Sequence, residues 1–509
     1  MSKHVVIIGA GIGGLATANM LAKAGYTVSL YEKNATPGGR AGTMSTKGFT
    51  FDTGPSWYLM PEVFAHYFSL FGKSVDHELD LIRLTPAYKV FFEHEDPVTI
   101  TSDSTTDAAT FEAIESGAGA QLEDYVKKGD VIYQLSLKHF LYTNFSSYRD
   151  FTKTDVIRRG ATMATLAITP IDTYVRRFVT DHRLRQILEY PMVFLGSSPF
   201  SAPAIYSLMS ALDFREGVYY PRGGLYTIID RLVALGSELG VTYHYDTAVR
   251  SIDTHNHEVQ GITLSDSTQI AADIVISNAD LHFTETKLLA PQDRSYPARY
   301  WNKREAGPSA LLMYLGVKGS LPNLEHHNLF FVDDWKQNFD AIFKNKTVPV
   351  PASLYICKPS ATDSSVAPKG TENMFVLVPL PAGADMSAHT KETMADTYLA
   401  LIEKHFDIPD LRKRLIVKEL FGPDDFSDKF NAWQGSALGP SHILRQSAIF
   451  RTPNKSRKVT GLYYVGGFTT PGIGLPMCLI GAELIYKRLA GDKRGGPIQE
   501  IKQLVKDEE

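Results

Sequence analysis

Val5-Val6-Ile7-Ile8-Gly9-Ala10-Gly11-Ile12-Gly13-Gly14 is the stretch of the chain that says most about its fold. The first four residues are apolar and β-branched, which is typical of a buried strand. Residues 15–24 then indicate a helix, residues 27–31 indicate a second strand, and Glu32 follows at once. Strand, glycine-rich turn, helix, strand and acid are the parts of a dinucleotide-binding βαβ unit.

Each part of this unit has a physical role. Gly9 permits a tight turn, Gly11 lets the backbone approach a pyrophosphate, and Gly14 lets helix and strand pack closely. The helix N-terminus, with Gly13 in its first turn, presents free N–H groups to phosphate. Glu32 is placed to accept hydrogen bonds from ribose hydroxyls. At this point NAD and FAD are equally good candidates.

Composition excludes several classes of protein. The chain has 509 residues, enough for two or three domains, and its net charge of −4 gives nucleic-acid binding no support. Two cysteines cannot build a disulfide framework or a zinc site, so we expect no metal and a reducing cytoplasm. Glycines interrupt the first apolar run, which excludes a secretory signal. Glycines and prolines also interrupt residues 462–486, the best candidate for a membrane span.

Later segments return to the nucleotide-binding pattern. Short strands are expected between residues 241 and 277, followed by Asn278-Ala279-Asp280. Residues 462–467 indicate one more buried strand, which leads into a second glycine-rich turn and a helix over residues 475–489. A strand, a turn and a helix N-terminus again suit an anionic or electron-rich group.

These patterns predict an α/β fold with discontinuous domains. A Rossmann-like domain takes residues 1–75, 220–295 and 455–490, a mixed-sheet substrate domain takes residues 76–110 and 296–454, and residues 491–509 form a loosely held, charged tail. Residues 111–219 are expected to be helical, with apolar and aromatic patches. That region is either a helical core, which the sequence favours, or a tunnel and membrane-facing surface for an apolar substrate.

Several motifs occur together in a recognisable order. They are the opening turn with Glu32, Pro37-Gly38-Gly39-Arg40, residues 49–55, Tyr220-Pro221-Arg222-Gly223-Gly224, Ser277-Asn278-Ala279-Asp280, residues 362–368 and residues 462–474. With these motifs the chain resembles the flavin-dependent amine oxidase and phytoene desaturase superfamily, and within it the bacterial-type carotenoid desaturases. The resemblance covers nearly the whole length.

The resemblance implies non-covalently bound FAD and a set of residues that hold it. It places the pyrophosphate on the opening glycines, the ribose on Glu32 and the adenine beside the backbone of Val249. Arg40 and the turn after residue 53 would approach the flavin, as would the closing turn. The implied cofactor-binding residues are Gly9, Gly11, Gly13, Gly14, Glu32, Lys33, Gly39, Arg40, Gly54, Pro55, Ser56, Val249, Asn278, Gly467, Gly474 and Leu475.

The implied reaction is the introduction of C=C bonds into phytoene or a related carotenoid precursor. A hydride equivalent passes to flavin N5, and a quinone or oxygen reoxidises the flavin. In the family an Arg-Asp pair followed by a basic residue lies near the reacting end, which here matches Arg149, Asp150 and Lys153. A histidine that the family often carries in the closing turn is absent from Thr469-Thr470-Pro471-Gly472.

Other functions stay open at this stage. The chain could be a carotenoid isomerase, a hydrocarbon oxygenase or an amine oxidase of the same superfamily. A non-enzymatic prenyl-binding chaperone is disfavoured by the intact opening unit. Because a carotenoid hydrocarbon is insoluble in water, we expect a cytoplasmic protein that is peripherally associated with the cell membrane.

Overall fold

A computed structural model describes residues 3–145 and 154–505. The opening unit consists of β1 (His4–Ile8), α1 (Ile12–Lys23) and β2 (Thr27–Tyr31), as the sequence predicts. These elements belong to a five-stranded sheet in the order β19-β13-β1-β2-β9, with β19 spanning Leu462–Tyr464, β13 Ile274–Ser277 and β9 Thr242–His244. All its neighbouring strands are parallel, so their carboxyl ends meet at one edge.

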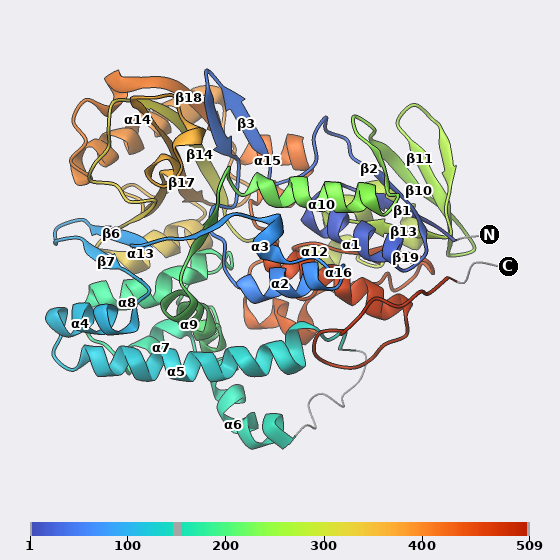
Figure 1. The fold of residues 1–509 in the computed structure, drawn as a ribbon, viewed down its shortest axis with the longest axis horizontal. Coiled ribbons are helices and arrows are strands. Elements are labelled where there is room, and N and C mark those ends of the chain that lie inside the picture. The colour runs from blue at the N-terminus through green and yellow to red at the C-terminus, as the bar shows by residue number, and fades with distance from the viewer. Residues whose placement is uncertain (1–2, 146–153, 506–509) are drawn as a thin grey trace.

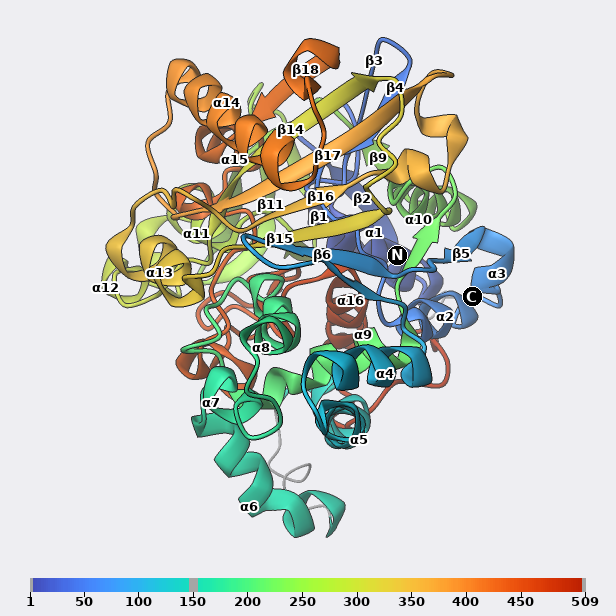
Figure 2. The ribbon, with the colours of Figure 1, turned by 90° about the vertical axis from the view of Figure 1, so that its left-hand side faces the viewer.

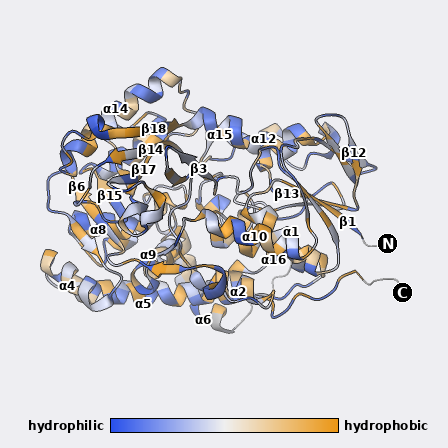
Figure 3. Cartoon of the chain, turned by 45° about the horizontal axis from the view of Figure 1, so that its top comes forward, coloured by the Kyte–Doolittle hydropathy of each residue, from blue (hydrophilic) through white to orange (hydrophobic). Residues whose placement is uncertain are grey.

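Helices cover one face of this parallel sheet, and its other face packs against Ile252, Val259 and Ile262. Figure 1 shows α1 together with α16 (Leu475–Leu489) and α10 (Tyr226–Glu238) beside it. Strands β1 and β13 are almost wholly buried, and Figure 3 shows that they are largely apolar. Burial on both faces is typical of a parallel sheet. Glu483, the one charged residue that the apolar run 462–486 contains, forms a 2.8 Å ion pair with His66 and accepts a hydrogen bond from the Ile498 N–H.

The strands that follow β9 form a sheet of their own. Here β10 (Val249–His255), β11 (Glu258–Leu264) and β12 (Gln269–Ala271) are antiparallel neighbours. The expectation that this whole segment rejoins the nucleotide-binding sheet is therefore wrong for these three strands. Only β9 and β13 of the segment join it, because they alone pair with β2 and β1.

A mixed seven-stranded sheet forms the second layer. Its order is β18 (Leu415–Phe421), β14 (Ser309–Lys318), β17 (Thr371–Leu380), β16 (Leu354–Cys357), β15 (His327–Phe331), β6 (Tyr88–Phe92) and β7 (Val98–Ile100). Figure 2 shows α14 (Ala388–His405) on one side of it and the helices α4 (Ser104–Ile114), α5 (Ala118–Ser136) and α8 (His182–Glu189) on the other. Alternate residues of β14 separate accordingly: Leu311 and Met313 belong to the core under α14, whereas Leu312 and Tyr314 belong to the core shared with α1.

Two further sheets have two strands each. Strands β3 (Thr43–Thr46) and β4 (Phe49–Asp52) are antiparallel, and so are β5 (Leu81–Arg83) and β8 (Tyr219–Pro221). Shorter helices of the chain are α2 (Pro61–Ser69), α3 (Val75–Glu78), α11 (Leu281–Phe283), α12 (Ala298–Trp301), α13 (Trp335–Asp340) and α15 (Pro423–Phe430).

The segment after β7 is helical, as predicted. It contains α4 (Ser104–Ile114), α5 (Ala118–Ser136), α6 (Thr154–Ile168), α7 (Ile171–Val175), α8 (His182–Glu189) and α9 (Ser207–Glu216). Figure 1 shows α6 projecting at the bottom of the molecule. Within the described residues, none of the helices is both long and apolar enough to cross a membrane.

The carboxyl-terminal segment packs on the nucleotide side. The Leu504 N–H donates to the Ala24 carbonyl, the Lys502 N–H donates to the Tyr486 hydroxyl, and Ile498 is buried. The prediction that this tail is loosely held is therefore wrong for residues 491–505. Its apolar residues, such as Ile498 and Leu504, indicate packing on the domain, although most of the tail is charged or polar.

Candidate functional site

The opening turn is tightly packed at the carboxyl end of β1. Gly9 has φ +99°, which favours glycine. A Cβ on Gly14 would lie 2.1 Å from the Gly9 carbonyl oxygen, and one on Gly11 or Gly13 would lie 2.7 Å from the Asn278 amide. The turn therefore needs glycine at Gly9 and Gly14, and the Asn278 side chain fills the space beside Gly11 and Gly13.

Glu32 lies beside this turn and is buried. Its Oε2 accepts a 2.8 Å hydrogen bond from the Ala10 N–H, and its Oε1 accepts from the Asn34 N–H at 2.9 Å. A carboxylate offers about four lone-pair sites, so acceptor capacity remains for a ligand hydroxyl. The acid thus both supports the turn and faces the cavity described below.

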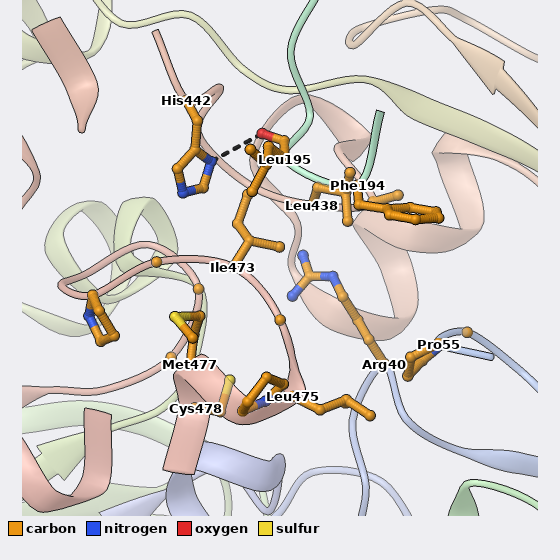
Figure 4. A pocket seen from close by; sticks show the side chains of 18 of the residues that line it. Arg40, Pro55, Phe194, Leu195, Leu438, His442, Ile473, Leu475, Met477 and Cys478 are labelled. Carbon is orange, nitrogen blue, oxygen red and sulfur yellow. Dashed lines mark hydrogen bonds between the residues drawn. The ribbon is translucent and has the colours of Figure 1, made fainter. Parts of the chain in front are cut away.

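Arg40 lies in the turn that packs on the opening unit. The Gly38 N–H donates to the Ala10 carbonyl at 2.8 Å, which joins the two turns. The guanidinium donates to the Ser436 carbonyl at 3.3 Å, while its Nε has no hydrogen-bond partner among the described residues. Burial lowers the pKa of Arg40, and the Asp280 carboxylate opposes that shift. Figure 4 shows the guanidinium directed towards Ile473 and Leu438.

One cavity of about 1410 Å³ joins these features. All the predicted cofactor residues line it except Gly14, which packs behind the turn against Gly9. Pockets for one small ligand usually measure about 300–1,000 Å³. This cavity is therefore large enough for a dinucleotide and part of a second molecule.

The closing turn forms the opposite wall. Gly474, with φ +120°, precedes α16, so the first N–H groups of that helix face the cavity. Beside the turn lies His442, which sequence reasoning missed. Its Nδ1 is 2.9 Å from the Leu195 carbonyl oxygen, and its Nε2 is 3.2 Å from Nη1 of Arg451. A carbonyl only accepts and a guanidinium only donates, so Nδ1 carries the proton and Nε2 accepts.

Away from the opening turn, the wall of the cavity is largely apolar and aromatic. Helix α6 contributes one stripe of small and apolar residues, and the second sheet and the helical segment contribute aromatic rings. The lining there includes Ile157, Gly160, Met163, Ala164, Ala167, Tyr190, Phe194, Phe331, Trp335, Phe339, Tyr355 and Phe375. The helical segment therefore provides a tunnel wall as well as a core; for α6 the sequence signal was the spacing of its small residues.

A buried acid supports one of these rings. Oδ2 of Asp213 accepts hydrogen bonds from the Tyr88 hydroxyl at 2.7 Å and the Tyr190 hydroxyl at 2.9 Å. Burial raises the pKa of Asp213 to about 7, although both hydroxyl donors oppose the shift. The network fixes the Tyr190 ring against the cavity.

The predicted acid–base residues Arg149, Asp150 and Lys153 lie outside the described residues. Cys357 and Cys478 are free cysteines, as expected. Their separation in the sequence gave no metal motif, but Cys357 does lie near His326 and His327, in a cluster that sequence spacing could not reveal.

The residues present fit FAD. The opening turn has no room for a side chain at Gly9 or Gly14, and a buried acid stands at the end of β2. Arg40 lines the same cavity, and its buried Nε has no hydrogen-bond partner among residues 3–145 and 154–505. Helices α1 and α16 both begin at this cavity, so their N-termini face it. Such a donor set suits a pyrophosphate and an electron-rich ring.

Comparisons with known proteins agree with this geometry. The model of the family described as flavin containing amine oxidoreductase matches residues 12–483. The chain is 42% identical over 490 residues to a carotenoid 3,4-desaturase of Haloarcula japonica, covering 96% of this chain and 98% of that one. It is 36% identical to a zeta-carotene-forming phytoene desaturase of Myxococcus xanthus, covering 96% and 94%. A wild-type putrescine oxidase bound to putrescine has the same fold, with a TM-score of 0.62 at 15% identity and coverage of 97% and 99%.

The protein is thus an FAD-dependent oxidoreductase with a mixed α/β fold. The chain belongs to the flavin-containing amine oxidoreductase family and, within it, to the carotenoid desaturases.

Proposed function

We propose that the protein introduces C=C bonds into phytoene or a related carotenoid, which it takes from a membrane. The observation that carries this proposal is the single cavity, which has a dinucleotide turn at one end and the apolar stripe of α6 at the other. A hydrocarbon offers no polar handle, so only shape and apolar contact can position it. A polar amine would instead need hydrogen-bonding groups at the apolar end.

The chain's own residues would bind FAD, orient the substrate and exclude water from the reacting bond. Gly9, Gly11 and Gly13 would hold the pyrophosphate of FAD, Glu32 its ribose, and Arg40 and the closing turn its flavin side. When bound, FAD supplies a two-electron oxidation, taking a hydride equivalent from one carbon while the neighbouring carbon loses a proton. The aromatic rings around Tyr190 would keep the reacting bond dry and aligned. Arg149, Asp150 and Lys153 remain our proposal for the acid–base groups, and a quinone or oxygen for the electron acceptor.

Exposed apolar side chains mark the proposed membrane contact. Ile157 and Ile168 on α6 are 63% and 74% exposed, and the segment before β19 exposes Leu444, Ile449 and Phe450. Four of these residues also line the cavity and so form its rim: Ile157, Leu444, Ile449 and Phe450. Ile168 does not line it. Arg158 and Arg159 are exposed on the same helix and suit anionic headgroups. This arrangement supports peripheral association, with the rim facing the lipid.

The test is turnover of a membrane-dissolved carotenoid. FAD-loaded protein is mixed with anionic vesicles that carry phytoene or a more unsaturated carotenoid, with a quinone without air or with air alone, and the products are separated by chromatography. New conjugated polyenes, with an equivalent loss of substrate, support the proposal and give the step count. Isomerised substrate without net oxidation would indicate an isomerase, and turnover of putrescine alone would indicate an amine oxidase; either result contradicts the proposal.

A further inference from the structure

Arg451 is a buried cation directly behind the closing turn. It is 4% exposed. Its Nε donates to the Thr469 carbonyl at 3.1 Å, its Nη2 donates to the Gly467 carbonyl, and its Nη1 donates to the Gln446 carbonyl at 3.3 Å and to Nε2 of His442. Every one of these acceptors is neutral.

No carboxylate in the described part of the chain forms an ion pair with Arg451. The charged side chain that most affects it is Arg304, which has the same sign, while Tyr206 and Tyr300 are neutral hydroxyls. Burial lowers the pKa of Arg451 to about 10, which leaves it charged at neutral pH. Burying a charge without a counter-ion has a large desolvation cost in free energy. A negatively charged ligand near Arg451 would offset that cost.

The cavity is the place where that partner would lie. Gly467 and Gly472 line the cavity, and a Cβ on Gly472 would lie 3.8 Å from the guanidinium carbon of Arg451 and 2.7 Å from Nε2 of His442. Only the thickness of the turn therefore separates the charge from the cavity. Figure 4 shows His442 on the same side of the cavity as Ile473, in the turn.

We propose that Arg451, held in place by His442, acts as the counter-charge for the negative charge that FAD gains on reduction, and so raises the reduction potential of the bound flavin. The inference rests on the proposed placement of the flavin beside the closing turn. It assigns Arg451, which does not line the cavity, as the counter-charge, and His442 as the positioning residue that holds its guanidinium. In a low-dielectric interior, a charge one residue layer away acts far more strongly than it would in water.

His442 is uncharged, so the positive charge at this pair of residues lies on the Arg451 guanidinium alone. Since Nδ1 donates to the Leu195 carbonyl, Nε2 must accept from Arg451 and cannot carry a second positive charge beside it. Burial and the Arg451 charge both lower the pKa of His442. His442 therefore orients the guanidinium of Arg451 and adds no second positive charge beside it.

The experiment measures the bound flavin itself. FAD-loaded wild type, Arg451→Lys and Arg451→Gln are compared by their two-electron midpoint potential and by their affinity for sulfite, which adds to oxidised flavin and leaves it negatively charged. We expect Arg451→Gln to bind sulfite at least tenfold more weakly and to have a lower potential, by about 30 mV for each tenfold change in a two-electron equilibrium. Arg451→Lys keeps the charge and should stay within threefold of wild type.

A second pair of variants tests the charge with Arg451 in place. His442→Glu would pair with Arg451 and neutralise it, whereas His442→Gln is the uncharged match. We expect a potential drop and weaker sulfite binding only in His442→Glu. Arg488→Gln, which removes a half-buried cation that does not line the cavity, should change neither value.

The outcomes separate this inference from the proposed function. If Arg451→Gln retains FAD with wild-type potential and sulfite affinity, Arg451 is only a structural tie for the turn and the inference is wrong. If Arg451→Gln loses FAD or does not fold, equal values in His442→Glu and His442→Gln overturn it instead. If the wild-type protein cannot be loaded with FAD, that result contradicts the proposed function itself.

Discussion

The Glu32 carboxylate at the end of β2 accepts a 2.8 Å hydrogen bond from the Ala10 N–H in the turn after β1. The acid that would bind the ribose is therefore also a brace for the turn that would bind the pyrophosphate. Since the Asn34 N–H donates to its other oxygen, the carboxylate is fixed in orientation before any ligand arrives. Such preorganisation lowers the entropic cost of binding.

The first prediction separates these two roles of Glu32. Glu32→Gln can still accept from Ala10 through its amide oxygen but loses the charge, so FAD affinity should fall about 10–100-fold, the equivalent of about 1.5–3 kcal/mol for a charged hydrogen bond. Glu32→Ala should lose a similar affinity and also melt at a lower temperature. FAD titration by flavin fluorescence and thermal unfolding check both; unchanged affinity in the two variants would contradict the role.

The second prediction concerns space at the opening turn. A Cβ on Gly14 would lie 2.1 Å from the Gly9 backbone oxygen, which cannot move without opening the turn. Gly14→Ala should therefore destabilise the protein by about 1–3 kcal/mol, as overpacking does, and release FAD. The matched control is Gly160→Ala on α6, where the new Cβ would meet no heavy atom of the described residues within 4 Å. Equal melting temperatures for the two variants would refute the packing argument.

The sequence predicts features that depend on neighbouring residues and misses those that depend on contacts between distant segments. Residues 475–489 are a helix as predicted, because its turn residues and apolar run are local signals. His442 could not be found, because its meeting with Gly472 depends on how a loop packs on a distant turn. The three antiparallel strands after β9 were misassigned for the same reason, since strand partners are chosen by tertiary packing.

The third prediction concerns pH and Asp213. Its pKa is about 7 in the folded protein and about 3.8 as the ordinary value, so the folded state holds the proton more tightly. Stability from this group is therefore full below about pH 4 and is lost as pH rises towards 7, with a slope of up to about 1.4 kcal/mol per pH unit. Asp213→Asn keeps an acceptor for Tyr88 and Tyr190 without titrating. Urea unfolding from pH 4.5 to 7.5 should show a smaller decline for the variant; parallel curves would contradict the prediction.

The fourth prediction concerns the rim of the cavity. The double variant Ile157→Glu, Ile449→Glu places charges on two exposed rim residues and should reduce co-sedimentation with anionic vesicles by tenfold or more, because each buried aliphatic side chain contributes about 1.5–3 kcal/mol. The control is Val350→Glu, Ile416→Glu, which alters two other exposed apolar residues that do not line the cavity. Equal binding by the two double variants would show that the rim does not face the lipid.

The last prediction concerns access along α6. Ala167 lines the cavity, whereas Ala161 on the same helix is exposed and does not. Ala167→Trp should therefore obstruct the apolar end and lower carotenoid turnover at least tenfold, while Ala161→Trp adds the same bulk to solvent and should leave turnover near wild type. Because Ala167 belongs to the end of the cavity remote from the opening turn, FAD content and the flavin absorbance spectrum should match wild type in both. Turnover that falls equally in the two variants would mean that bulk on α6 disturbs the helix itself, and loss of FAD in Ala167→Trp would place the cofactor where we expect the hydrocarbon.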